Sequence, residues 1–406
     1  MPRRNTFAIA AVAVLSIPLL AAAQPQIINL GALPGENSSQ PKAISADGSV
    51  IVGNTGGGTN AGPAFRWNAQ DGIQILSPDT QLHIRAIDAF GTRAIGTTSL
   101  GTPWWDTRVF DIGSGEFLIE DFYGVALSAS GGVAAGGKWP GNRPARWTPS
   151  GGVVEILSVS DYPGASFATD ISGTGNTIVG WTTIELQSRA FVWKAGGGVT
   201  LIDLRTDTES YTDAKAVSAD GSTLVGSYGP SLPGPTQAYR YTTADGIMLL
   251  DPPSDAYSHS LAYCVNADGN VIGGAVFGPP SGGTRAMYWS ESLGMVDLNV
   301  YLPSVGVDLT GWDLSFLIDI SADGKAVTGW GLLDGLGRAF LITGLPGNTP
   351  LCPADLTGDN AVNLADLNLV LANFGTTTPD GDTNNDGVVD LADLNAVLGA
   401  FGTDCP

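Results

Sequence analysis

One short motif occurs seven times in this chain, and it limits the possible fold more than any other feature. Its first copy runs from Lys42 to Gly53 and contains the pair Asp47-Gly48. An Asp-Gly pair between β-branched residues predicts a hairpin, because the tight turn needs residues that tolerate positive φ. A second glycine follows each turn glycine by five residues: Gly48 and Gly53, Gly91 and Gly96, Gly131 and Gly136, Gly175 and Gly180, Gly221 and Gly226, Gly269 and Gly274, Gly324 and Gly329. The spacing of roughly 40 to 55 residues between copies matches one propeller blade.

Two more strands are predicted after each hairpin. An aromatic-rich third strand occurs at residues 64–67, 108–111, 145–147, 190–193, 238–241, 286–289 and 339–342. A fourth strand follows at residues 72–76, 116–120, 153–157, 199–203, 247–251 and 295–299. Four strands per repeat correspond to one blade of an all-β propeller.

The seventh repeat lacks a fourth strand, and residues 26–31 resemble the missing one. Pairing them with residues 339–342 would close the ring and cover an exposed strand edge. We therefore predict a seven-bladed β-propeller over residues 24–344 that is closed by its N-terminal strand. The alternative, an open solenoid of hairpins, leaves residues 26–31 without a partner.

The repeat pattern A-x-x-I-S-A-D-G-x-x-V-V-G, followed by A-F-x-W and G-x-x-x-L, resembles the HAF family of extracellular repeats over about residues 26–344. That family belongs to bacterial exported proteins and has no well-defined activity. The resemblance implies an extracellular location and a repeat fold, and it transfers no catalytic residue.

The N-terminus is typical of an exported protein. Arg3 and Arg4 precede an apolar run over residues 7–20 and three small residues at 21–23. This pattern predicts a signal peptide over residues 1–23, with an uncleaved membrane anchor as the alternative. The mature chain has no predicted membrane span and is expected to be secreted or held at the cell surface. A formal charge of -21 argues against nucleic acid as a partner.

The two ends of the predicted propeller differ in their loops. The tight hairpin turns share one face, whereas the opposite face carries longer loops that differ between blades. Exposed aromatic rings on such loops suit sugar rings or extended polymers. The candidate ligand residues are Trp104, Trp105, Trp139, Trp181 and Trp312. The alternative is that these rings cover blade ends and fill gaps between blades.

Catalytic residues are not indicated. His83 and His259 are the only histidines, and neither stands in a hydrolase motif. Both are predicted to lie in loops between blades. Acidic residues on the long-loop face include candidates for a glycosidase pair: Asp79, Asp161, Glu185, Asp207, Glu209, Asp213, Asp255, Asp308 and Asp313. The acids of the hairpin turns are interpreted as turn formers: Asp47, Asp220, Asp268 and Asp323.

A second, small module follows a linker at residues 345–351. Residues 352–406 contain two segments that match at an offset of 27 residues. Each begins with oxygen-bearing side chains at the spacing of a calcium loop, with a backbone carbonyl at the seventh position. The predicted ligands of two Ca²⁺ ions are Asp355, Thr357, Asp359, Ala361, Asn363 and Asp366 in the first loop, and Asp382, Asn384, Asp386, Val388, Asp390 and Asp393 in the second.

Paired calcium loops that end in Asp and continue into L-N-x-V-L resemble the type I dockerin module, and Cys352-Pro and Cys405-Pro resemble its GC-type variety. The resemblance implies that calcium folds an α-helical module that binds a cohesin-like or other cell-surface protein. It implies docking through Leu364, Ala365, Leu391 and Ala392, which could equally pack at the helix starts. Cys352 and Cys405 bracket the module and are expected to form a disulfide, whereas Cys264 is expected to be a small buried residue.

Two functions from different classes fit these features. The first is an exported, non-catalytic propeller that binds a polysaccharide or a protein through its long-loop face and is anchored by its calcium-dependent tail. The second is a propeller glycosidase or polysaccharide lyase carried in an extracellular complex. A surface-layer building block is a third possibility.

Overall fold

The computed structural model describes residues 24–56, 62–98, 106–112, 115–141, 143–157, 162, 164–202, 210–229, 235–278, 283–347, 354–357, 361–378, 381–383 and 388–403. It divides the chain into one unit of residues 25–349 and another that contains residues 350–406. The predicted signal peptide lies outside the described residues, as do Trp104, Trp105, Asp161, Asp207, Glu209, Cys352, Asp359, Asn384, Asp386 and Cys405.

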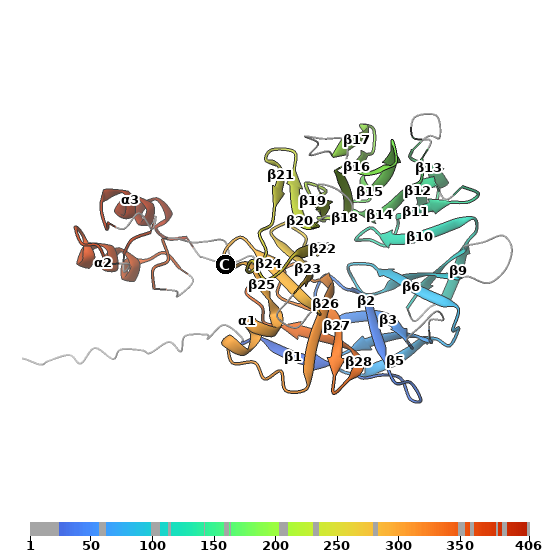
Figure 1. Ribbon diagram of the computed structural model, residues 1–406, viewed down its shortest axis with the longest axis horizontal. Coiled ribbons are helices and arrows are strands. Elements are labelled where there is room, and N and C mark those ends of the chain that lie inside the picture. The colour runs from blue at the N-terminus through green and yellow to red at the C-terminus, as the bar shows by residue number, and fades with distance from the viewer. Residues whose placement is uncertain are drawn as a thin grey trace, which may run out of the picture. The chain divides into compact units, whose positions relative to one another are not determined.

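The larger unit contains seven four-stranded sheets, arranged as the blades of a propeller (Figure 1). Blades one to three comprise β2 (Ser39–Ile44), β3 (Val50–Thr55), β4 (Ala64–Asn68) and β5 (Gly72–Ser77); β6 (Leu82–Ile87), β7 (Arg93–Thr98), β8 (Asp106–Asp111) and β9 (Gly115–Ile119); and β10 (Phe122–Leu127), β11 (Ala134–Lys138), β12 (Arg143–Thr148) and β13 (Gly152–Glu155). Blades four to six comprise β14 (Ser166–Ile171), β15 (Thr177–Ile184), β16 (Gln187–Lys194) and β17 (Gly198–Ile202); β18 (Tyr211–Val217), β19 (Thr223–Gly229), β20 (Gln237–Thr242) and β21 (Gly246–Leu249); and β22 (His259–Val265), β23 (Val271–Phe277), β24 (Thr284–Ser290) and β25 (Gly294–Asp297). Blade seven comprises β26 (Trp312–Ile320), β27 (Val327–Leu333), β28 (Leu336–Thr343) and, from the other end of the sequence, β1 (Gln26–Asn29).

The closing strand confirms the predicted ring closure. Strand β1 pairs antiparallel with β28, so that Gln26 lies opposite Thr343 and Asn29 opposite Phe340. Beyond the strand, the Leu30 amide donates to the Ala339 carbonyl at 3.1 Å. The first and last parts of the propeller sequence therefore share one blade.

One polar side chain stabilises the turn of each motif, and it is a serine in five of the seven copies. In the first copy the Ser45 hydroxyl accepts the Val50 amide at 2.9 Å, and Ser45 donates to Asp47 at 2.6 Å. The hydrogen bonds from Ser45 and Ser49 hold the pKa of Asp47 below its usual value. The same five-residue contact occurs at Asp88, Ser128, Ser172, Ser218, Asn266 and Ser321. Asp47 is therefore a turn former, as predicted.

The second glycine of each motif lets two strands approach closely. A Cβ on Gly53 would lie 2.1 Å from the Gln40 carbonyl oxygen, and one on Gly226 would lie 1.9 Å from that of Asp213. The partner strand is the innermost strand of the blade, and it carries a β-bulge just after this contact. Every innermost strand has such a bulge: β2, β6, β10, β14, β18, β22 and β26.

A closed ring of backbone hydrogen bonds joins the seven blades around the channel. The motif alanine of each blade, replaced by Gly173 in blade four, donates its amide to the carbonyl of its counterpart in the next blade. The Ala322 amide of blade seven donates to the Ala46 carbonyl of blade one at 2.8 Å and so completes the ring. The members of this collar are Ala46, Ala89, Ala129, Gly173, Ala219, Ala267 and Ala322. Small side chains are required because seven copies converge on one axis. The hydrogen-bonded turn, the collar and the β-bulge together give the motif residues structural roles in the fold.

One helix replaces the end of the fourth strand that was predicted over residues 295–299. Helix α1 (Leu298–Ser304) is capped by Asp297, which accepts the Asn299 amide at 2.8 Å. Leu298 and Leu302 are fully buried in the core between blades six and seven. Pro303 and the short length hide this helix from sequence periodicity. No helix in the described part of the chain is long and apolar enough to cross a membrane.

The smaller unit contains two matched helices, α2 (Leu364–Asn373) and α3 (Leu391–Ala400). Asn363 and Asp390 cap them, and each helix has a capping box completed by an aspartate three residues later. The core contains four fully buried valines in two pairs, each pair 27 residues apart: Val362, Val370, Val389 and Val397. The internal repeat seen in the sequence therefore folds into two equivalent halves.

Candidate ligand site in the central channel

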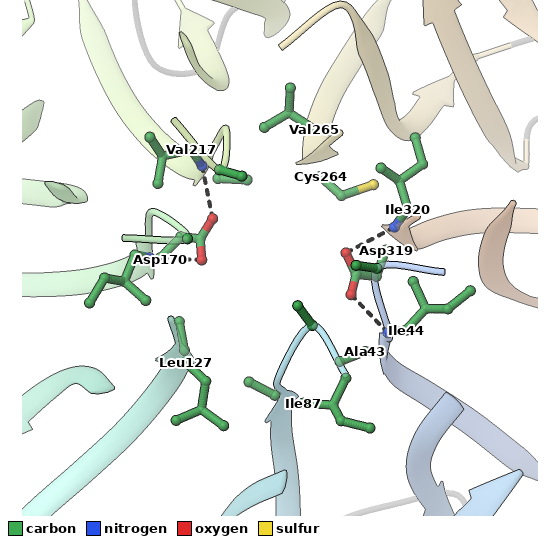
Figure 2. A pocket seen from close by; sticks show the side chains of 18 of the residues that line it. Ala43, Ile44, Ile87, Leu127, Asp170, Val217, Cys264, Val265, Asp319 and Ile320 are labelled. Carbon is green, nitrogen blue, oxygen red and sulfur yellow. Dashed lines mark hydrogen bonds between the residues drawn. The ribbon is translucent and has the colours of Figure 1, made fainter. Parts of the chain in front are cut away.

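The innermost strands of the blades enclose a cavity of about 290 Å³ on the propeller axis (Figure 2). Its wall extends from the β-bulges to the collar. At the bulge the seven blades carry six different residue types, with lysine occurring twice: Lys42, Arg85, Val125, Thr169, Lys215, Tyr263 and Ile318. The fold itself demands no particular residue there, because the same backbone accommodates cationic, aromatic and aliphatic side chains.

Two aspartates occupy the next position along the strand, where four other blades carry alanine and one carries Cys264. The Asp170 carboxylate accepts the Val217 amide of the next blade and its neighbour's amide, both at 2.8 Å. Asp319 accepts the amides of Ile44 and Ile320 at 2.9 Å. Figure 2 shows the two carboxylates on opposite sides of the channel. Each aspartate therefore clamps its blade to the next one.

Burial dominates the protonation of these two aspartates. It raises the pKa of Asp170 to about 7 and that of Asp319 to about 6, although the accepted amides favour the charged forms. The charge of Asp319 also raises the pKa of Asp170. Sequence reasoning missed both residues. An alignment of the seven copies at this one position would have shown two acids among small residues.

We expect the propeller to lose stability as the pH rises from 5 to 8. The unfolded chain releases these protons near pH 4, whereas the folded chain retains them until about pH 6 to 7, so folding is opposed by on the order of a few kcal/mol above that range. Thermal unfolding at both pH values should show a smaller Tm difference in D170A/D319A, which places the commoner alanine at both sites. An unchanged Tm difference in that variant would contradict this account.

Cationic groups gather on the wall of blades one and two. Burial and the charge of Arg85 lower the pKa of Lys42, while burial, Arg85 and Lys42 lower the pKa of His83. The Arg85 guanidinium lies 5.0 Å from the centre of the Tyr123 ring, and its Nε donates to the Thr97 hydroxyl at 3.1 Å. This cluster is a potential site for an anionic group.

The sequence analysis predicted that both histidines lie in loops between blades, and this prediction was wrong. Both belong to innermost strands: His83 is the second residue of β6, and His259 is the first residue of β22. The His259 Nδ1 accepts the Thr236 amide at 2.9 Å. These strands begin several residues before the motif, so the motif alone did not reveal their full length.

The described candidate tryptophans have unequal surroundings. Trp181 is half-buried against Phe167, with ring centres 4.7 Å apart, near the start of β14. Trp312 packs edge-on to the fully buried Phe340 at 5.9 Å, beside the core of blades six and seven. Trp139 is half-buried and donates its amide to the Asp121 carbonyl. Of these, Trp312 is the one most involved in packing.

Two further cavities lie away from the axis. A groove of about 650 Å³ on the outer edges of blades one and two contains Arg108 and Asp79, which pair with each other at 3.3 Å. A cleft of about 200 Å³ between blades five and six contains Tyr257 and His259. The outer groove is larger than the channel cavity, but its walls come from strand edges and connecting residues on one side of the ring. The channel instead receives side chains from all seven blades.

The predicted calcium loops are only partly described. The carboxylates of Asp366 and Asp393 are fully buried. Asp366 accepts the amides of Thr357 and Asn363 at 2.9 and 2.8 Å, which explains it as a helix cap. No group of three or more metal-binding side chains converges among the described residues, which exclude positions 358–360 and 384–387. Residues 351–406 nevertheless contain nine aspartates and no Lys, Arg, His or Glu. This all-oxygen donor set fits a hard cation such as Ca²⁺.

The two loops are not identical in detail. The Asp393 carboxylate accepts the Thr383 amide at 2.8 Å, and Thr383 directly follows Asp382, the first predicted ligand of the second loop. Asp366 instead binds Thr357, two residues after Asp355, through both amide and hydroxyl. In the first loop the Asn363 side chain also donates to the Ala361 carbonyl at 3.2 Å. Four of its predicted oxygen ligands, Thr357, Ala361, Asn363 and Asp366, are therefore engaged in hydrogen bonds within the loop and the start of α2.

The comparisons with known proteins place the chain among β-propellers. No family model and no curated protein matches its sequence. Oligogalacturonate lyase from Vibrio parahaemolyticus has a TM-score of 0.55 at 10% identity, over 78% of this chain and 93% of that one. The β-propeller domain of the trilobed protease from Pyrococcus furiosus has a TM-score of 0.54 at 11% identity, over 78% and 98%. The GH74 xyloglucanase from Xanthomonas campestris has a TM-score of 0.50 at 12% identity, over 77% and 53%. The protein is therefore a seven-bladed β-propeller, and at these identities the likeness concerns the fold alone.

Proposed function

We propose that the chain is an exported, non-catalytic binding protein whose propeller holds a polysaccharide or protein ligand at the mouth of its channel. One observation carries this proposal: the bulge position is occupied by six different residue types in seven blades, on an otherwise repeated scaffold. The motif positions around it all have folding roles in turns, collar or bulge. Binding residues are commonly presented in this way, as variable groups on a rigid frame.

The channel chemistry suits binding better than catalysis. Asp88, Asp170 and Asp319 are the acids of the cavity wall. Both oxygens of Asp170 and of Asp319 accept backbone amides, and the oxygens of Asp88 accept two amides and a hydroxyl of its own turn. A general acid or nucleophile must present a carboxyl oxygen to the substrate. The carboxylates instead hold adjacent blades together.

A propeller glycosidase or polysaccharide lyase is the second candidate. It is favoured by the placement of two carboxylates with raised pKa values across one channel. Among the similar structures, one is an oligogalacturonate lyase and another a xyloglucanase. This candidate predicts product release that is abolished in D170N or D319N.

The C-terminal module would dock the propeller to an extracellular partner of the cohesin type. Its two helices expose equivalent apolar side chains: Leu364, Leu371 and Phe374 on and after α2, and Leu391, Leu398 and Phe401 on and after α3. Leu364 and Leu391 are 64% and 63% exposed, which argues against packing at the helix starts. Exposed apolar patches of this kind are typical of protein interfaces.

The test is a glycan array combined with a pull-down from extracellular extract, both using residues 24–406. We expect retention of a defined glycan class or of a propeller-dependent protein, and recovery of the bound glycan uncleaved. Cleavage of that glycan would favour the enzymatic candidate. The absence of any propeller-dependent ligand would contradict the proposal.

A further inference from the structure

Two unpaired cations face the channel from neighbouring blades. Lys42 and Arg85 occupy the same bulge position of β2 and β6, and both line the axial cavity. Among the described residues, neither has a carboxylate within ion-pairing distance. The third cation of this layer, Lys215, differs because its Nζ lies 2.8 Å from the Asp213 carboxylate.

This arrangement opposes folding unless something else binds there. Burial and mutual repulsion both disfavour the charged forms of adjacent cations. The acids of the wall do not compensate, because Asp319 and Asp170 direct their oxygens to backbone amides and Asp88 directs its oxygens to groups of its own turn. The chain as a whole has 39 acidic and 18 basic residues, so a basic pair without acidic partners goes against its composition.

One aromatic ring lies beside Arg85, and another lines the same cavity from blade six. The Tyr123 ring lies under the Arg85 guanidinium. Tyr263 lines the cavity, and its ring lies 6.3 Å from that of Phe316. Rings near a charged group are suited to a sugar that carries an acid, because the ring face contacts apolar C–H groups while the cation meets the carboxylate.

We propose that Lys42 and Arg85 form a carboxylate subsite in the channel, which takes the terminal uronic acid unit of an oligosaccharide. The cavity of about 290 Å³ lies at the small end of ligand sites, so a chain end fits better than a polymer run. The net charge of -21 also disfavours a densely charged polymer and favours a single acidic unit. This inference rests on the proposed binding function and names its ligand class.

The test is titration calorimetry of the secreted chain, residues 24–406, with three probes: a disaccharide ending in glucuronic acid, the matched disaccharide ending in glucose, and inorganic phosphate. We expect the acidic disaccharide to bind at least tenfold more tightly than the neutral one. K42Q/R85Q should lose at least tenfold in affinity for the acid, whereas K194Q, which removes an exposed cation of β16 that does not line the cavity, should change it less than twofold.

The outcomes separate this inference from the proposed function. Glycan binding that does not distinguish the acidic disaccharide, or that is unaffected in K42Q/R85Q, would overturn the subsite and leave the binding function intact. Phosphate binding as tight as that of the acidic disaccharide would also overturn it, in favour of a free-anion site. Binding of no glycan and no protein would remove the proposed function itself.

Thermal unfolding provides an independent check on Lys42. Because its charge has no described partner, K42Q should keep or raise the Tm of the ligand-free protein. A purely structural role for the ammonium predicts the opposite, a lower Tm. The Tm gain on adding the acidic disaccharide should be present in the wild type and lost in K42Q/R85Q.

Discussion

Removal of the closing strand is expected to destabilise the whole propeller. A chain that begins at residue 31 lacks β1 and leaves the β28 edge without its partner. It also loses Leu30, which is 3% exposed, and the half-buried Ile27 and Ile28, which pack against the cores on both sides of blade seven. Burial of about 2 kcal/mol for Leu30 and about 1.5 kcal/mol for each half-buried isoleucine gives a loss of about 5 kcal/mol. For a unit of the size of residues 25–349, that corresponds to a Tm lower by about 5–10 °C.

Differential scanning calorimetry on the two chains, beginning at residues 24 and 31, measures this effect. The exposed edge should also promote self-association, because unpaired strand amides recruit other strands. A converse variant, I27C/I342C, places two cysteines at paired positions of β1 and β28. Its oxidised form should unfold at a higher temperature than its reduced form. Equal Tm values for the two chain lengths would contradict the role of β1 in closure.

Removal of calcium is expected to unfold the C-terminal module and spare the propeller. Residues 351–406 carry nine aspartates and no basic residue, so their mutual repulsion opposes folding and would be relieved by the proposed Ca²⁺ ions. Bound metal would then supply folding free energy to the module. In a chain of residues 24–406, EDTA should abolish one thermal transition and the helical signal of α2 and α3, which have ten residues each.

Matched variants test which acids are responsible. D382A, in the second loop, should lower the temperature of the module transition in calcium, whereas D255A, an exposed acid of the propeller, should not. Readdition of Ca²⁺ should restore the transition in the wild type. A module transition that is insensitive to EDTA would show that the capping contacts of Asp366 and Asp393 suffice for folding.

The sequence was informative wherever local chemistry repeats. Asp47 and its counterparts were predicted as turn formers because an Asp-Gly turn is a local matter, and Asp47 bonds only to residues within its own turn. The closing strand was predictable because the seventh repeat lacked a fourth strand, and residues 26–31 resembled a fourth strand but belonged to no repeat. Helix α1 was not predictable from the sequence, since its stability comes from Leu298 and Leu302, which are buried against distant strands.

The channel was beyond sequence reasoning for a physical reason. The contact between Asp170 and Val217 spans 47 residues and forms only when two neighbouring blades pack together, and that between Asp319 and Ile44 spans 275 residues and forms only after the ring has closed. The collar depends on closure in the same way. The aromatic residues of the loops predicted a ligand site on the long-loop face. The structure instead favours a site on the axis, where Lys42, Arg85 and Tyr263 line one cavity.

The central claim is that the channel is the ligand site. Its most direct test is hydrogen–deuterium exchange of a chain of residues 24–406, with and without the glycan or protein that it retains. Ligand binding in the channel predicts slower exchange in the innermost strands, above all β2, β6 and β22, and little change in the outer strands β5 and β9. It also predicts that a bound glycan is recovered intact. Protection confined to the outer groove beside Arg108 and Asp79, with the innermost strands unchanged, would contradict the assignment of the channel as the ligand site.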